Sequence, residues 1–267
     1  MKWSIGLLML SVVAGITNGQ TPLTIDAEAV ITSARPLDDA ADMLEHKFGW
    51  VITYEDPVWS FAGEVVDLVP VRKPGTRRFL APRPGQLPIG ALLSTAGERP
   101  DKGSLVSKII QAHDDAGNPG SFKIVSDGDF LHLIPTFAKG VGGGREAVSP
   151  LLDTPIHTPI DETTPSLAIR QIIDEVSRTR GIQIDIDMSW RSDQIVFGPL
   201  RTRVDATGQP ARSLLLKILK EANRPLTWRL LCEPSLPDHQ GFCALTLRSM
   251  HVYLTDDSGN VVVRPLR

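Results

Sequence analysis

Two cysteines, Cys232 and Cys243, are the residues whose spacing predicts the most definite chemistry. They stand on either side of a loop that contains Pro234 and Pro237, so they can face each other across a hairpin. In an oxidising compartment such a pair forms a disulfide, and closing so short a loop stabilises the fold by roughly 3 kcal/mol. A metal site would need further ligands: His239 lies between the cysteines, but no second His or Cys pair stands at zinc-finger spacing. We therefore predict a disulfide and no metal site.

The residues that hydrolases use do not form a recognisable catalytic set. No Gly-x-Ser-x-Gly nucleophile motif occurs. The histidines lack the His-Glu-x-x-His spacing and are scattered over positions 46, 113, 132, 157, 239 and 251. His132 alternates with Phe130 and Ile134 in an expected strand, which favours a structural role over that of a base. We predict no catalytic residue and no bound cofactor.

Two further patterns suggest ligand sites but have simpler explanations. Asp185 and Asp187 could serve in acid–base work or bind calcium. They alternate with the isoleucines of an expected strand, however, so they occupy slots that any polar residue could fill. A glycine cluster at 140–144 resembles a phosphate loop, but Arg145 follows it where Lys and then Ser or Thr would be needed. We interpret the cluster as part of a linker.

A stretch rich in Pro and Arg at 70–100 is the candidate region for contact with a partner. Its prolines oppose helix and central strand, which predicts an inserted, extended loop with an edge strand. Arg77 and Arg78 could contact an anionic partner, and Trp50, Tyr54 and Trp59 could add contact area. A solvated loop is the alternative, because exposed arginines among prolines are ordinary loop chemistry.

The elements that would position these residues occur in the same order twice. Pro36 begins a helix with its apolar residues on one face, Gly49 ends it, and a strand follows at 50–54. Pro165 begins a second such helix, Gly181 ends it, and a strand with alternating isoleucines follows from Ile182. A single arrangement used twice would explain both stretches.

Each copy continues with a second helix and a hairpin. In the first copy Ser104 can cap a helix that Gly117 closes, and a tight turn at Asp127 and Gly128 joins the strands 122–125 and 130–134. The second copy offers a helix around 214–222 and strands at 226–232 and 243–248. The predicted fold class is α+β, with two tandem small units, each of two helices packed on a small mixed sheet. The units span 20–138 and 165–267, joined by a linker at 139–164, and a hairpin at the end of the chain would complete the second sheet.

The beginning of the chain predicts export. Lys2 precedes an uncharged apolar run too short to span a membrane, and small residues follow it, so residues 1–19 are interpreted as a signal peptide. The expected location is periplasmic or extracellular, with no stable membrane insertion after cleavage. The formal net charge is only −3 and neither sign forms a long block, so the composition predicts no nucleic-acid partner.

The repeated pattern resembles the short N-terminal domain of secretins and TonB-dependent receptors, here in two diverged tandem copies without a barrel. The residues that carry the resemblance are 35–41 with 48–54 in the first copy, and 211–219 with 226–228 in the second. The resemblance implies a role in protein contacts, because those families use the domain for subunit assembly or signalling. We therefore expect an exported, non-catalytic protein-binding or assembly module of the bacterial envelope or secretome. Its partner would be an envelope or secreted protein, and a free strand edge would be the docking surface. The alternative is a small secreted hydrolase with a site between the two repeats.

Overall fold

The computed structural model describes residues 21–22, 27–69, 78–96, 100–187, 196–223, 225–255 and 261–265. The predicted signal peptide at 1–19 lies outside this range. The fold is α+β. It has a first half, residues 27–139, and a second half, residues 160–249.

The first half begins with the helix and strand that the sequence predicts. Strand β2 (Val30–Ser33) leads into α1 (Pro36–Phe48), whose proline lies in the first turn, where its missing N–H costs nothing. Gly49 ends α1 in the left-handed conformation, at φ 68°, and β3 (Val51–Glu55) follows.

The second helix that the sequence predicts in the first half starts about one turn earlier than expected. Helix α3 (Lys102–Asp115) is capped by Asp101, whose side chain accepts the backbone N–H of Ser104 at 2.8 Å, so Ser104 is not itself the cap. Strands β7 (Ser121–Asp127) and β8 (Phe130–Lys139) form the expected hairpin, and Gly128 takes a positive φ of 59° in its turn.

The predicted insertion contains more regular structure than an extended loop. A short helix, η1 (Ala62–Glu64), and β4 (Val65–Asp67) precede residues 70–100, and β5 (Leu80–Pro82), inside that range, pairs with β4. Strand β6 (Gly85–Pro88) pairs with β2, and α2 (Gly90–Ser94) is a helix that the sequence does not predict. Residues 70–77 and 97–99 lie outside the described ranges.

The stretch predicted to be a linker at 139–164 is packed against the second half. It holds β9 (Arg145–Ala147), η2 (Leu151–Asp153), β10 (Pro155–Ile156) and β11 (Ile160–Thr163). Four of its apolar residues are buried in the core of the second half: Leu151, Leu152, Ile156 and Ile160. Glu175 also accepts the backbone N–H of His157 at 2.8 Å. The stretch is therefore packed and not extended, because these apolar side chains have a core to enter, and its role as a boundary between two units stays a prediction.

The second half begins with β11. It contains α4 (Pro165–Arg180), which ends at Gly181, then β12 (Ile184–Asp187), β13 (Thr202–Val204) and β14 (Gln209–Pro210). Helix α6 (Ala211–Lys220) and the strands β15 (Leu226–Cys232) and β16 (Cys243–Ser249) complete it.

One seven-stranded sheet runs through both halves in the order β12-β16-β15-β3-β8-β7, and β9 pairs with β8. In this sheet β3 is parallel to β8 and β12 is parallel to β16, whereas the hairpins β7–β8 and β15–β16 are antiparallel. The sequence predicts a separate small sheet for each unit, whereas here β15 of the second half pairs with β3 of the first. The division into two units stays a prediction.

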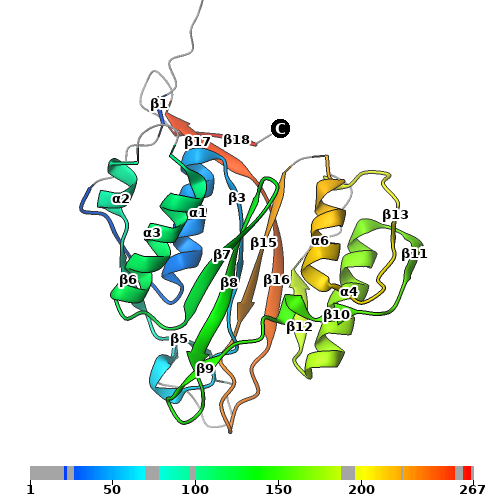
Figure 1. The fold of residues 1–267 in the computed structure, drawn as a ribbon, viewed down its shortest axis with the longest axis horizontal. Helices are drawn as coiled ribbons and strands as arrows, with labels where there is room; N and C mark the ends of the chain where they lie inside the picture. Colours follow the sequence, from blue (N-terminus) through cyan, green and yellow to red (C-terminus); the bar gives the residue numbers. More distant parts are fainter. Residues whose placement is uncertain are drawn as a thin grey trace, which may run out of the picture.

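The two halves place their helices on opposite faces of this sheet. In Figure 1, α1, α2 and α3 lie to the left of the sheet, and α4 and α6 lie to its right. One core packs α1 and α3 against β3 and β8, and the other packs α4 and α6 against β15 and β16. Alternate side chains of the central strands therefore enter different cores.

The last hairpin, β17 (His251–Thr255) and β18 (Val261–Pro265), is present as predicted but does not complete the second sheet. It forms a separate three-stranded sheet with β1 (Thr21–Pro22), near the beginning of the chain. This pairing joins segments more than two hundred residues apart, which a local pattern cannot indicate.

Candidate functional site

The two halves meet at a seam, where β15 lies parallel to β3. Arg229 is opposite Tyr54 and Leu230 is opposite Glu55 in this pairing. The N–H of Asp56 donates to the carbonyl of Leu230 at 2.8 Å. The ladder is short, so side chains complete the contact between the halves.

Arg229 carries a fully buried positive charge across the seam. Its Nε lies 2.5 Å from Asp38, and its Nη2 lies 2.7 Å from Asp42 and 3.0 Å from Glu45. All three carboxylates come from α1 in the first half, on one stripe of the helix. The Nη1 of Arg229 donates to the carbonyl of Ile52 on β3 at 2.6 Å. A buried guanidinium with these partners fixes the second half against the first.

Burial changes the acidity of this cluster. It raises the pKa of Asp38 to about 6 and that of Glu45 to about 7, although the charge of Arg229 opposes both changes. Burial alone would lower the pKa of Arg229, but the carboxylates of Glu45, Asp38 and Asp42 raise it overall. Arg229 therefore stays charged, while Glu45 gains a proton near neutral pH.

A second buried ion pair crosses the seam on the other face of the sheet. Arg212, on α6, lies 2.5 Å from Glu55 through Nη2 and 3.0 Å from Asp153 through Nε. Glu55 also accepts the backbone N–H of Leu152 at 3.2 Å. Burial raises the pKa of Glu55, and the charge of Arg212 opposes this rise. Both faces of the seam thus carry buried charge pairs.

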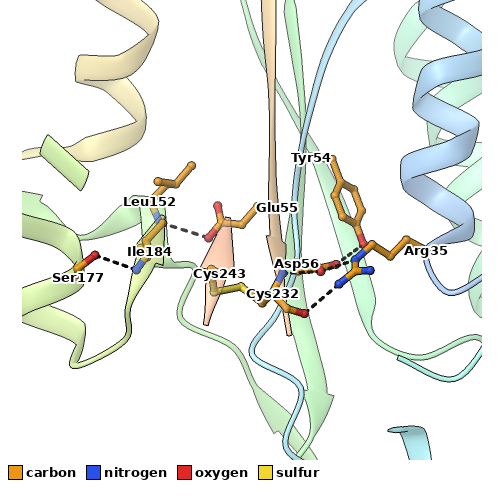
Figure 2. The surroundings of a disulfide bond; sticks show 9 residues. All are labelled: Arg35, Tyr54, Glu55, Asp56, Leu152, Ser177, Ile184, Cys232 and Cys243. Atoms are coloured by element: carbon orange, nitrogen blue, oxygen red, sulfur yellow. Dashed lines mark hydrogen bonds and ion pairs between the residues drawn. A yellow bond between two sulfur atoms is a disulfide. The ribbon is translucent and has the colours of Figure 1, made fainter. Parts of the chain in front are cut away.

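The disulfide between Cys232 and Cys243 joins β15 to β16 at directly opposed positions, as the sequence predicts. Figure 2 shows that its strand end is also tied to the first half through Asp56. The carboxylate of Asp56 accepts the backbone N–H of Cys232 at 2.9 Å, the Nε of Arg35 at 2.6 Å and the hydroxyl of Tyr54 at 2.8 Å. Arg35 in turn donates to the carbonyl of Cys232 at 2.9 Å.

His132 is a buried side chain of the sheet. Its ring stacks between Phe130 and Trp228, and its Nδ1 lies 2.7 Å from the hydroxyl of Thr53. Burial and the charge of Arg212 lower its pKa to about 4. The imidazole is therefore neutral at physiological pH and packs as part of the core.

The predicted partner-contact residues are placed differently from the expectation. Trp50, Tyr54 and Trp59 are buried, the first two in the core of the first half, so they do not offer exposed contact area. Arg78 is half exposed and pairs with Asp238 at 2.8 Å and with Asp67 at 3.6 Å. Arg77 lies outside the described residues.

The aspartates of β12 remain on the surface. Asp185 and Asp187 are exposed, and Asp185 accepts a hydrogen bond from Gln183 at 3.0 Å. Within the described ranges, no group of three or more His, Cys, Asp or Glu residues is arranged to hold a metal ion. None of the helices described is both long and apolar enough to cross a membrane.

The two outer strands of the sheet are the other notable surfaces. Among the described residues, no strand pairs with the outer edge of β7 at one side or of β12 at the other. Val125, on β7, is an exposed apolar side chain at 38%. An unpaired edge presents backbone N–H and C=O groups that can accept another strand.

A small pocket lies between the halves. Its lining includes Asp56, Ser60, Lys139 and Glu146, and Arg180 of α4 contributes from the second half. Arg180 donates to both the hydroxyl and the carbonyl of Ser149, which holds it at the rim.

Comparison with protein families, with curated proteins and with solved structures found no match.

Proposed function

We propose that this chain is an exported, non-catalytic protein-binding or assembly module of the bacterial envelope or secretome, which binds through the outer edges of its central sheet. The observation that carries the proposal is the seam itself, because the chain already joins its halves by pairing one strand edge with another. The outer edges of β7 and β12 offer the same kind of surface to a partner strand.

Two further features support export and contact with proteins. The Cys232–Cys243 disulfide suits an oxidising compartment such as the periplasm or the cell exterior. The resemblance to the short N-terminal domain of secretins and TonB-dependent receptors favours a role in assembly or signalling.

Site-specific photocrosslinking in the producing cell tests the proposal. A photoreactive residue would replace Lys123 on β7 or Asp187 on β12, both of which are exposed edge-strand residues. The matched control would replace Lys108, an exposed lysine on α3. We expect protein adducts from one or both edge positions and none from position 108. Absence of edge adducts, or equal yields at all three positions, would contradict binding through the edges.

A small secreted hydrolase is the second candidate, and the pocket lined by both halves is the observation that favours it. A substrate screen on the purified chain, with Glu146→Ala as the matched variant, tests this alternative. Hydrolysis that the substitution abolishes would support the hydrolase and contradict a non-catalytic module.

A further inference from the structure

The first helix and strand of the two halves correspond residue by residue. Gly49 and Gly181 end α1 and α4 in the same left-handed conformation. The N–H of Ile52 donates to Glu45 at 3.3 Å, and the N–H of Ile184 donates to Ser177 at 3.2 Å. Donor and acceptor are seven residues apart in both halves, and Figure 2 shows the second of these bonds.

The hairpins of the two halves correspond in the same way. Ile52 pairs with Leu131, and Ile184 pairs with Cys243. On the other side, Leu131 pairs with Ser126 and Cys243 pairs with Cys232. Strand β7 therefore occupies in the first half the place that β15 occupies in the second, with Ser126 equivalent to Cys232.

Two exposed residues of β7 are equivalent to one buried and one partly buried residue at the seam. Lys123, three residues before Ser126, is equivalent to Arg229, and Val125 is equivalent to Leu231. Arg229 is fully buried among side chains of α1 and the backbone of β3, and Leu231 is partly buried against the core of the first half. Lys123 and Val125 have no such cover and are exposed.

The two open edges of the sheet are therefore the same two kinds of edge that already associate inside the chain. At the seam, the outer edge of β15 pairs in parallel with β3. The equivalent of β15 at the free end is β7, and the equivalent of β3 at the other free end is β12. We propose that β12 of a second copy pairs in parallel with β7, so that the sheet continues from one chain into the next. This inference rests on the proposed edge-binding function and names the partner.

The backbone of β7 is oriented for this pairing. In a hairpin with a two-residue turn, alternate residues direct their N–H and C=O groups away from the partner strand. In β7 these are Phe122, Ile124 and Ser126, given the pairing of Asp127 with Phe130. Their equivalents on β15 point toward β3, where the carbonyl of Leu230 accepts its cross-seam hydrogen bond.

Charge on α4 complements Lys123. Asp174 stands seven residues before Gly181, as Asp42 stands seven residues before Gly49, so it would face Lys123 of the neighbouring copy. Lys123 and Asp174 are exposed, and neither forms an ion pair within the described part of the chain. Arg170 stands at the place of Asp38, so the contact between copies has fewer carboxylates than the seam and also brings a like charge toward Lys123. We therefore expect weak, reversible and salt-sensitive association.

The contact is head-to-tail, because it joins two different edges. Such an interface does not close on itself in a dimer; it generates open chains, or rings where the rotation between copies allows closure. Species larger than a dimer are thus expected as the concentration rises.

Sedimentation velocity of the purified, disulfide-bonded chain over a range of concentrations tests the inference. We expect concentration-dependent growth beyond a dimer, and a loss of association of about fivefold or more in Lys123→Glu and in Asp174→Lys. Each of these variants should associate poorly alone. A mixture of the two should associate, because every contact between unlike chains then restores one pair of opposite charges. The matched control is Lys108→Glu, which reverses an exposed charge on α3 away from the edge.

Three results would overturn the inference. The chain could stay monomeric at all concentrations, in which case Lys123 acts as the charge that keeps an edge strand unpaired. Association could be insensitive to both charge reversals, or the mixture could fail to recover it. Crosslinks from the edge to a different protein, with a monomeric purified chain, would sustain the proposed function and reject self-association.

Discussion

Replacing Arg229 with methionine tests whether the buried charge cluster holds the two halves together. Methionine keeps much of the side-chain volume but leaves Asp38, Asp42 and Glu45 without their buried cation. Removing one partner from a buried ion pair costs about 3–5 kcal/mol, because the remaining charge is desolvated and uncompensated. We predict that Arg229→Met lowers the free energy of unfolding by this amount at pH 8.

The loss should shrink at lower pH. Asp38 and Glu45 have folded-state pKa values of about 6 and about 7, above their usual 3.8 and 4.5. Between about pH 4 and pH 7 the folded state thus binds more protons than the unfolded state, and stability rises as the pH falls. The increase in the pKa of Asp38 alone corresponds to about 3 kcal/mol of free energy. This amount destabilises the folded state in full at pH values above the folded-state pKa. Without Arg229 both pKa values rise further, so protonation relieves more of the cost.

Urea denaturation at pH 8 and pH 5 measures both effects, with the m-value as a check that the same surface is exposed on unfolding. Arg248→Met is the control, because Arg248 also contacts Asp42 but its side chain is 37% exposed. Its loss should stay below about 1 kcal/mol. A loss below about 1 kcal/mol for Arg229→Met at pH 8, or an equal loss at both pH values, would refute the reasoning.

Three further predictions concern the disulfide, Glu55 and His132. The double variant Cys232→Ala with Cys243→Ala should lose about 3 kcal/mol of stability in urea. Thiol titration of the native chain without reductant should find no free thiol, and a titratable thiol would argue against the disulfide. Glu55→Gln should lower the free energy of unfolding by about 1.5–3 kcal/mol, because Arg212 loses a buried charged partner. Asp153→Asn, at a carboxylate that is 43% exposed, should lower it by less than about 1 kcal/mol. Similar losses in the two variants would contradict a buried Arg212–Glu55 ion pair. The pKa of His132 is lowered to about 4, so its contribution to stability is lost as the pH falls from about 6.5 toward 4. NMR titration should show a neutral ring at pH 5.5, and His132→Gln should remove this sensitivity to acid. A ring that is protonated at pH 5.5 would count against its burial.

The sequence was sufficient for the elements whose ends are set by local chemistry. Pro36 and Pro165 begin helices, and Gly49 and Gly181 end them, because a proline fits the first turn and a glycine tolerates positive φ. The turn at Gly128 and the opposed cysteines also depend only on neighbouring residues.

The seam could not be predicted, because its partners lie far apart in the sequence. Arg229 finds its carboxylates on α1, some 190 residues earlier, and Arg212 finds Glu55. A charged residue within an apolar strand is the one signal available: Glu55 ends the apolar run of β3, and Arg229 interrupts that of β15. A charged residue in a central strand needs a buried partner, but the sequence pattern does not indicate which residue that partner is.

The misinterpreted segments share a physical cause. Proline and glycine mark residues 139–164 as irregular, which is true locally, yet Leu151 and Leu152 still enter the core of the second half. The aromatic residues Trp50 and Trp59 suggest surface contact by type, but tertiary packing buries them. Burial depends on which strands become neighbours, and that is a property of the whole sheet.

Amide hydrogen exchange along β7 tests the edge-binding account most directly. The measurement would compare the dilute chain with the complex recovered by edge crosslinking. If a strand pairs there, the outward N–H groups of Ile124 and Ser126 should exchange quickly in the dilute chain and at least about tenfold more slowly in the complex. Unchanged exchange at these two amides, with new protection appearing only around the pocket at Asp56 and Lys139, would contradict the account.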